Sequence, residues 1–202
     1  VTGGIAAPVV FNVAAATYNE QVDIPGTING STANSITFQS ANGNPAGVVL
    51  SYNSTSTNFT LRLSGINNVK FRNMTISATN ATYGTALTLI NNASSDSFYN
   101  VIFNSVVTTT NSTNLSVIYV PSTSVSNFVY FDTCRINNGA YGSYFYSTGS
   151  TTIGASSQNV SFNNCDFVNQ YAYGMYNSNL EGLRLTKNRI TTNSALTSYY
   201  GT

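Results

Sequence analysis

Short segments of this chain alternate apolar and polar residues, with apolar side chains at every second position. In the segment 68–76, Val69 and Phe71 alternate with charged residues, and similar phrases occur at 128–136 and 159–167. Period-two alternation is typical of a β-strand with one buried face. No segment shows a sustained helical period, and β-branched residues are frequent, so the pattern predicts an all-β protein.

The phrases recur with an apolar anchor at the same place in each copy. The anchors lie 23 to 33 residues apart and are Phe38, Phe71, Phe98, Phe131, Phe162 and Leu185. Further apolar strands are expected at 59–63, 86–90, 117–120 and 144–146, with Gly-, Asn- and Ser-rich turns between them. A repeat of this length indicates stacked coils that cannot bury their apolar faces singly.

We therefore expect a parallel β-helix, a solenoid of about five to six coils, in the right-handed sense that parallel crossovers prefer. The chain is predicted to be one β-helix segment over 1–202, with the first coil at 1–30 and the stacked coils at 31–202. It begins without Met and shows neither a signal peptide nor a cap. These features predict a fragment of a longer solenoid within a larger parent chain.

Charge is scarce, since 6% of residues are charged and the net charge is +1. Scattered basic residues do not suit nucleic acid, which attracts clustered Lys and Arg, so no nucleic-acid partner is expected. No stretch is long and apolar enough for membrane insertion. The polar bulk is Asn, Ser and Thr, which is typical of secreted and cell-surface proteins and predicts an extracellular location.

Nine Asn-X-Ser/Thr sequons occur along the chain. One interpretation is N-glycosylation. The other is chance, because a chain rich in these three residues produces sequons by composition. The sequons at Asn73 and Asn159 fall inside the repeated strand phrase, which favours chance.

The segment 15–25 resembles the Gly-x-Tyr-x-Glu-x-Val-x-Ile phrase of the pectin-lyase-like right-handed parallel β-helix family, with Ala16 in place of Gly. The segments 34–40 and 63–76 are similar to that family too. In style the chain resembles β-helix regions of large secreted or cell-surface adhesin-like proteins of Bacteroidetes-type bacteria. Enzyme members of the family act on acidic polysaccharides with sets of Asp, Gln, Arg or His residues, and none of these sets is matched here.

Zero histidines exclude a Ser-His-Asp triad and His-based metal sites. The carboxylates are Glu20, Asp23, Asp96, Asp132, Asp166 and Glu181. A polysaccharide lyase or hydrolase would draw on Asp132 and Asp166 with Arg135, but the two Asp residues stand at different distances from their anchors. Solubilising roles are favoured for them and a structural role for Glu20, so no catalytic residue, metal or cofactor is predicted.

Cys134 and Cys165 each stand three residues after an anchor, which places them in one inward-facing column. Two buried free thiols are favoured over a disulfide, because in-register stacking does not suit disulfide geometry. The C-terminal third is weakly basic and contains Arg135, Arg184, Lys187 and Arg189. These residues are either a site for a carboxylated glycan or scattered charges in contact with solvent.

Tyrosines crowd the second half of the chain and supply its candidate ligand-binding site, Tyr141, Tyr144, Tyr173 and Tyr176. Aromatic faces stack on sugar rings, and a Tyr hydroxyl adds a hydrogen bond. The competing interpretation is a self-stacking aromatic ladder that stabilises a turn. Tyr-Gly pairs, expected to open successive coils, occur at 83–84, 141–142, 173–174 and 200–201.

The predicted function is a non-catalytic segment of an adhesin-like protein. It would form a rigid stalk with a polysaccharide or cell-surface glycan as its partner. A carbohydrate-active lyase or hydrolase domain is the alternative. A structural spacer without a ligand is a third interpretation.

Overall fold

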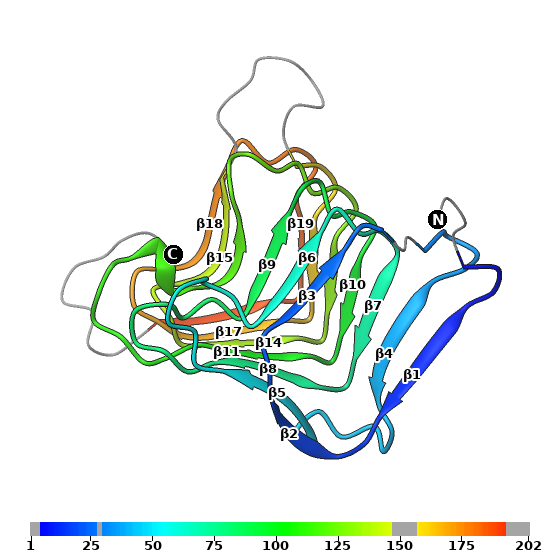
Figure 1. Ribbon diagram of the computed structural model, residues 1–202. Coiled ribbons are helices and arrows are strands. Elements are labelled where there is room, and N and C mark those ends of the chain that lie inside the picture. Colours follow the sequence, from blue (N-terminus) through cyan, green and yellow to red (C-terminus); the bar gives the residue numbers. More distant parts are fainter. Residues whose placement is uncertain (1–4, 28–29, 147–156, 193–202) are drawn as a thin grey trace.

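Three parallel β-sheets wrap around a common apolar interior in a right-handed parallel β-helix (Figure 1). The structure is a computed structural model and describes residues 5–27, 30–146 and 157–192. In this part of the chain there are six complete coils of three strands and two strands of a seventh. The predicted fold is confirmed, with slightly more coils than expected.

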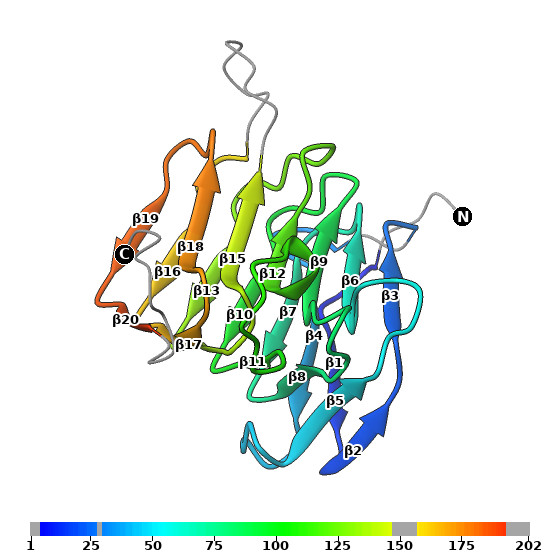
Figure 2. The ribbon, with the colours of Figure 1, turned by 90° about the vertical axis from the view of Figure 1, so that its left-hand side faces the viewer.

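Each sheet takes one strand from every coil, and Figure 2 shows the strands stacked side by side along the solenoid. The first sheet contains β1 (Val9–Val13), β4 (Ile36–Ser40), β7 (Val69–Arg72), β10 (Ser97–Tyr99), β13 (Tyr130–Asp132), β16 (Ser161–Asn163) and β19 (Arg184–Thr186). The second contains β2 (Ala16–Asn19), β5 (Val48–Tyr52), β8 (Thr75–Ala78), β11 (Ile102–Asn104), β14 (Arg135–Asn137), β17 (Asp166–Gln170) and β20 (Arg189–Thr192). The third contains β3 (Val22–Pro25), β6 (Leu61–Ser64), β9 (Leu87–Ile90), β12 (Ser116–Val120), β15 (Tyr141–Tyr146) and β18 (Tyr173–Ser178). One short 3₁₀ turn, η1 (Thr113–Leu115), precedes β12.

The anchor residues pair in register across the first sheet and form a phenylalanine ladder inside it. Neighbouring rings are nearly parallel, as for Phe131 and Phe162, whose centroids lie 4.6 Å apart with 7° between the planes. Phe11 of β1 extends the ladder by one rung that the anchor spacing did not reveal. Stacking and burial of these large rings hold the coils in one register.

Two backbone positions in each coil from β7 onward adopt the left-handed conformation, and Asn occupies about half of them. One position lies three residues before the anchor, at Asn68, Ser95, Phe128, Asn159 and Gly182. The other lies two residues after it, at Asn73, Asn100, Thr133, Asn164 and Lys187. Asn and Gly tolerate positive φ best. The Asn side chains also join successive coils, and Asn100 Nδ2 donates to Asn73 Oδ1 at 2.8 Å.

Candidate functional site

Most of the tyrosines whose rings pack against one another belong to strands of the third sheet, toward its outer face. Side chains at alternate positions of these strands point inward, as Leu87 and Leu89 do in β9. Between them, one outward residue per coil pairs in register with the next and forms a column of Asp23, Arg62, Thr88, Tyr119, Tyr144 and Tyr176. The column therefore changes from charged to aromatic along the solenoid.

The structure brings the four predicted tyrosines into one cluster. The rings of Tyr141 and Tyr173 stack at 5.6 Å between centroids, and those of Tyr144 and Tyr176 stack at 4.7 Å. The two pairs meet edge to face, with Tyr141 5.1 Å from Tyr144. Tyr141 is only 8% exposed, and its hydroxyl donates to Asn111 Oδ1. Its ring is a packing element beneath the face, so it offers little surface to a ligand.

Stacking within the cluster leaves little ring surface free to contact a sugar. Tyr144 lies between Tyr119 and Tyr176 in the column, with its ring centroid 5.7 Å and 4.7 Å from theirs. Both of its faces are therefore covered by neighbouring rings, and its edge and hydroxyl point outward. Tyr119 is covered by Tyr144 on one side only. On the other side its partner in the column is Thr88, which is too small to form another rung.

A groove of about 270 Å³ occupies the place of that missing rung. It is bounded by the 57–59 segment on one side and by η1 on the other, with Arg62, Thr88 and Tyr119 among its lining residues. Tyr119 was not among the predicted site residues. No motif marks it, and only the strand pairing places it in the column with Tyr144.

The groove has both apolar and polar lining residues, and its one charged residue, Arg62, is paired with Asp23. Arg62 donates two hydrogen bonds to Asp23, and its guanidinium carbon lies 4.2 Å from the centre of the Phe59 ring. Thr113 and Asn114 line the opposite wall, and their side chains donate no hydrogen bond within the described part of the chain. A tyrosine hydroxyl is protonated at neutral pH and can donate, and burial raises the pKa of Tyr119 further. The groove thus combines one aromatic face with several hydrogen-bonding groups.

The Tyr-Gly pairs have a different place from the one predicted. Tyr141-Gly142 and Tyr173-Gly174 begin β15 and β18 and pair in register, so they open strands of the third sheet and not new coils. A side chain at Gly142 would lie 2.4 Å from the carbonyl oxygen of Gly174, which explains the glycine. Tyr83-Gly84 lies ahead of β9 and outside this register, and the pair at 200–201 lies outside the described residues.

The carboxylates considered for catalysis do not converge. Asp132 belongs to the first sheet, where it accepts a hydrogen bond from Asn163, whereas Asp166 belongs to the second. Asp166 accepts two hydrogen bonds from Arg189, which hold its pKa below the usual range. Arg135 pairs in register with Asp166 but not with Asp132. Each carboxylate is already engaged, so neither is poised as a general acid.

Other reactive groups are buried. Cys134 and Cys165 are free thiols, 2% and 1% exposed, as their shared column predicted. Burial raises the pKa of Cys134. The side chain of Asp96 is fully buried; its Oδ1 accepts from the backbone N–H of Val69, and its Oδ2 has no hydrogen-bond partner among the residues that the structure describes. Among the described residues no group of three or more His, Cys, Asp or Glu is placed to hold a metal ion, and no helix there is long and apolar enough to span a membrane.

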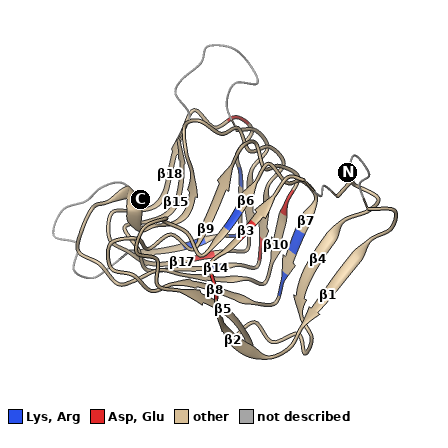
Figure 3. Cartoon of the chain, viewed as in Figure 1, with Lys and Arg blue, Asp and Glu red and all other residues tan. Residues whose placement is uncertain are grey.

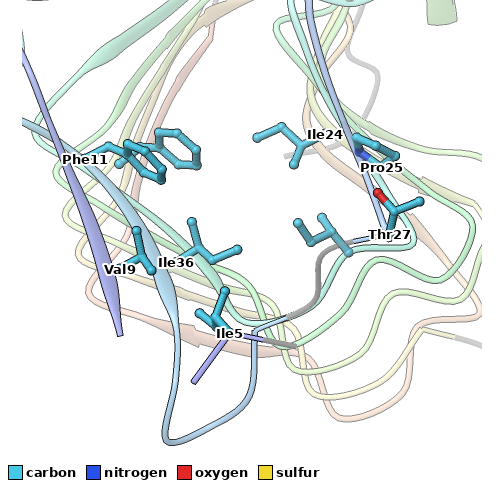
Figure 4. A pocket seen from close by; sticks show the side chains of 9 residues that line it. Ile5, Val9, Phe11, Ile24, Pro25, Thr27 and Ile36 are labelled. Atoms are coloured by element: carbon cyan, nitrogen blue, oxygen red, sulfur yellow. The ribbon is translucent and has the colours of Figure 1, made fainter. Parts of the chain in front are cut away.

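Two further hollows lie inside the solenoid at its first coils. One, of about 340 Å³, is lined almost wholly by apolar side chains, and Figure 4 shows Phe11, Ile24 and Ile36 facing it. The other, of about 320 Å³, is lined by apolar side chains together with Tyr18, Glu20 and Asp23. Most of the residues that line these two hollows are apolar, whereas the groove on the third sheet combines aromatic rings with several hydrogen-bonding side chains.

Comparisons with known proteins support the fold. No protein-family model matches the chain, and no curated protein matches its sequence. Among solved structures, a rice weevil pectin methyl esterase is similar with a TM-score of 0.65 and 15% identity over 95% of this chain and 60% of that one. Pectin methylesterases from carrot (TM-score 0.57, 18% identity, 94% and 57% covered) and Yersinia enterocolitica (0.56, 16%, 93% and 62%) are also similar. The chain spans about three fifths of the length of these structures. At this level of identity the likeness shows a shared parallel β-helix fold and nothing finer.

Proposed function

We propose that this chain is a non-catalytic, carbohydrate-binding β-helix segment of a secreted or cell-surface adhesin-like protein. The observation that carries the proposal is the groove beside Tyr119. It stands where the tyrosine column lacks a rung, so a sugar ring seated there continues the stack. The continuous sheets supply a rigid stalk that presents this face. The similar solved structures are named as enzymes of pectin, a polysaccharide, which supports a carbohydrate partner.

The groove's chemistry favours an uncharged sugar. Asp23 neutralises Arg62, and the remaining lining groups are hydroxyls, amides, aromatic rings and the aliphatic side chain of Ile90. Aromatic faces bind the apolar faces of sugar rings, while hydroxyl and amide groups bind their edges. We therefore expect neutral oligosaccharides to bind the third-sheet face.

Titration of neutral oligosaccharides, first selected on a glycan array, tests this site. Tyr119→Ala removes the ring and should weaken binding by about fivefold, since one aromatic contact is worth about 1 kcal/mol. Tyr119→Phe keeps the ring and should retain most of the affinity. Thr88→Tyr places another aromatic side chain in the groove and should block sugar binding, although the Tyr119 ring is retained. Unchanged affinity in Tyr119→Ala would contradict the proposal.

The alternative function is a carbohydrate-active lyase or hydrolase, which the names of the similar structures favour. The residues considered for it were Asp132 and Asp166 with Arg135. Turnover of a polysaccharide by the purified chain, lost in Asp132→Asn or Asp166→Asn, would establish that function. With both carboxylates engaged by neighbouring side chains, we expect no turnover.

A further inference from the structure

One end of the groove beside Tyr119 carries a side-chain amide that the folded chain leaves unused. Asn114 belongs to η1, and its backbone carbonyl accepts hydrogen bonds from the N–H of Gly84 and from Asn58 Nδ2, each at 2.9 Å. The residue lines the groove, but its side chain forms no hydrogen bond within the described chain. This amide therefore has an acceptor and two donors, all in one plane, for a ligand.

The other amide and the charged group of the lining are already engaged. Asn58 Oδ1 accepts a hydrogen bond of 3.1 Å from the N–H of Thr85, and its Nδ2 donates to the carbonyl of Asn114. Arg62 is paired with Asp23. The strands that follow β6 in the third sheet contain no charged residue, and Figure 3 shows how few charges the fold carries. A ligand in the groove thus meets one free amide and no unpaired charge.

The groups of the groove follow an order along the strands. Asn114 precedes β12 and Phe59 precedes β6, so both lie where strands of the third sheet begin. Tyr119 pairs with Thr88 inside the sheet, and Ile90 is the last residue of β9. Because the neighbouring strands are parallel, the free amide and the Phe59 ring share one end of the groove. The Tyr119 ring lies in the middle, and the aliphatic side chain of Ile90 lies at the other end.

We propose that the groove binds an N-acetylated amino sugar, as in neutral glycans that contain N-acetylhexosamine; this inference rests on the carbohydrate-binding function proposed above. The sugar ring stacks on Tyr119. At one end, the N–H and C=O of the acetamido group pair with the amide of Asn114, and its methyl group contacts Phe59. The ring carbon that bears the acetamido group lies across the ring from the one that bears the hydroxymethyl group, which places that edge on Ile90.

Other sugars match fewer of these groups. A hexose with hydroxyl groups alone has no methyl group for Phe59 and no planar pair of donor and acceptor for Asn114. An amino sugar without its acetyl group carries a positive charge, and the described residues that line the groove include no carboxylate. A uronate would meet Arg62, whose charge Asp23 already neutralises.

Three trisaccharides with the same linkage and ring configuration test the proposal. They are triacetylchitotriose, cellotriose and the deacetylated glucosamine trimer, which differ only in an acetamido, hydroxyl or ammonium group on each ring. Isothermal titration calorimetry at neutral pH measures the affinity of the wild-type chain for each. We expect triacetylchitotriose to bind at least about fivefold more tightly than cellotriose, because it adds amide hydrogen bonds and buries a methyl group. The glucosamine trimer should bind no more tightly than cellotriose.

Matched variants assign the preference to Asn114. Asn114→Ala should weaken binding of triacetylchitotriose by about fivefold and change binding of cellotriose by less than about twofold. Asn19→Ala changes an exposed Asn on the second sheet and should alter neither affinity. Tyr119→Ala and Ile90→Thr should each weaken both sugars, because they remove contacts that the two ligands share.

The outcomes separate this inference from the function on which it rests. Equal affinity for triacetylchitotriose and cellotriose, with both lost in Tyr119→Ala, overturns the inference and leaves the groove as a site for neutral sugars. A preference for the acetylated sugar that Asn114→Ala leaves unchanged also overturns it. Absence of binding by all three trisaccharides overturns the inference, and absence of any ligand on the glycan array overturns the proposed function as well. Circular dichroism confirms that each variant is folded, and the comparison of ligands on the wild-type chain needs no variant.

Discussion

Asp96 provides a sharp test of the structure, because it is a carboxyl group enclosed in the solenoid without a counter-charge. It lies in the turn before β10, and its Oδ1 accepts a hydrogen bond of 2.9 Å from the backbone N–H of Val69. Burial raises the pKa of Asp96 from 3.8 to about 8, although the bond from Val69 opposes the shift. At neutral pH the folded protein therefore keeps Asp96 protonated, whereas the unfolded chain releases the proton.

This difference makes the stability of the protein fall as pH rises. Where the folded state holds one more proton than the unfolded state, the free energy of unfolding decreases by about 1.4 kcal/mol per pH unit. The stabilisation from protonated Asp96 is complete below the pKa of this group in the unfolded chain, and it is lost as the pH rises through its pKa in the folded protein. Between pH 5 and pH 7 the expected loss is about 3 kcal/mol. The chain has no histidine, whose ordinary pKa would otherwise fall in this window.

Asp96→Asn removes the titration and keeps an oxygen for the Val69 N–H. Urea unfolding at pH 5, 6 and 7, followed by circular dichroism, gives the free energy of unfolding of both proteins. Between pH 5 and pH 7 the free energy of unfolding of Asp96→Asn should rise by about 3 kcal/mol relative to that of the wild-type protein. Asp96→Ala, which leaves the Val69 N–H without its acceptor, should be less stable than Asp96→Asn at every pH. Parallel pH profiles for wild type and Asp96→Asn would refute the reasoning.

Three further predictions concern the repeat itself. Phe98→Ala should lower the free energy of unfolding, measured with urea, by about 3–5 kcal/mol, because this ring is fully buried. Phe11→Ala should lower it much less, because the Phe11 ring is half-exposed at the end of the ladder. Thr133→Asn should stabilise the protein by up to about 1 kcal/mol, since it places Asn at φ 56°, where a β-branched residue is strained, and a lower midpoint would contradict this. Cys134 and Cys165 should not react with a thiol reagent until the protein unfolds, when two thiols should titrate; rapid labelling of the native protein would contradict their burial.

Local pattern was sufficient to predict the coils. Alternation and the recurring anchors gave the strands of the first sheet, because a strand buried on one face must place apolar residues at every second position. The column of Cys134 and Cys165 followed from the same anchor spacing, and both are buried as expected. The Asn-rich phrases also had a local cause, the left-handed turn positions, although the reason was visible only once the backbone was known.

The binding face depended on the tertiary structure. Segments joining the second sheet to the third differ in length from coil to coil, so residue counting does not reveal which third-sheet residues lie beside one another. Strand pairing placed Tyr119 on Tyr144 and set Thr88 in the next rung, which created the groove. It also placed Asp132 and Asp166 on different sheets. The sequence by itself determined the repeating coil, since burial of each strand is a local periodicity. Only the folded chain decided which side chains share a surface, since that depends on register between distant coils.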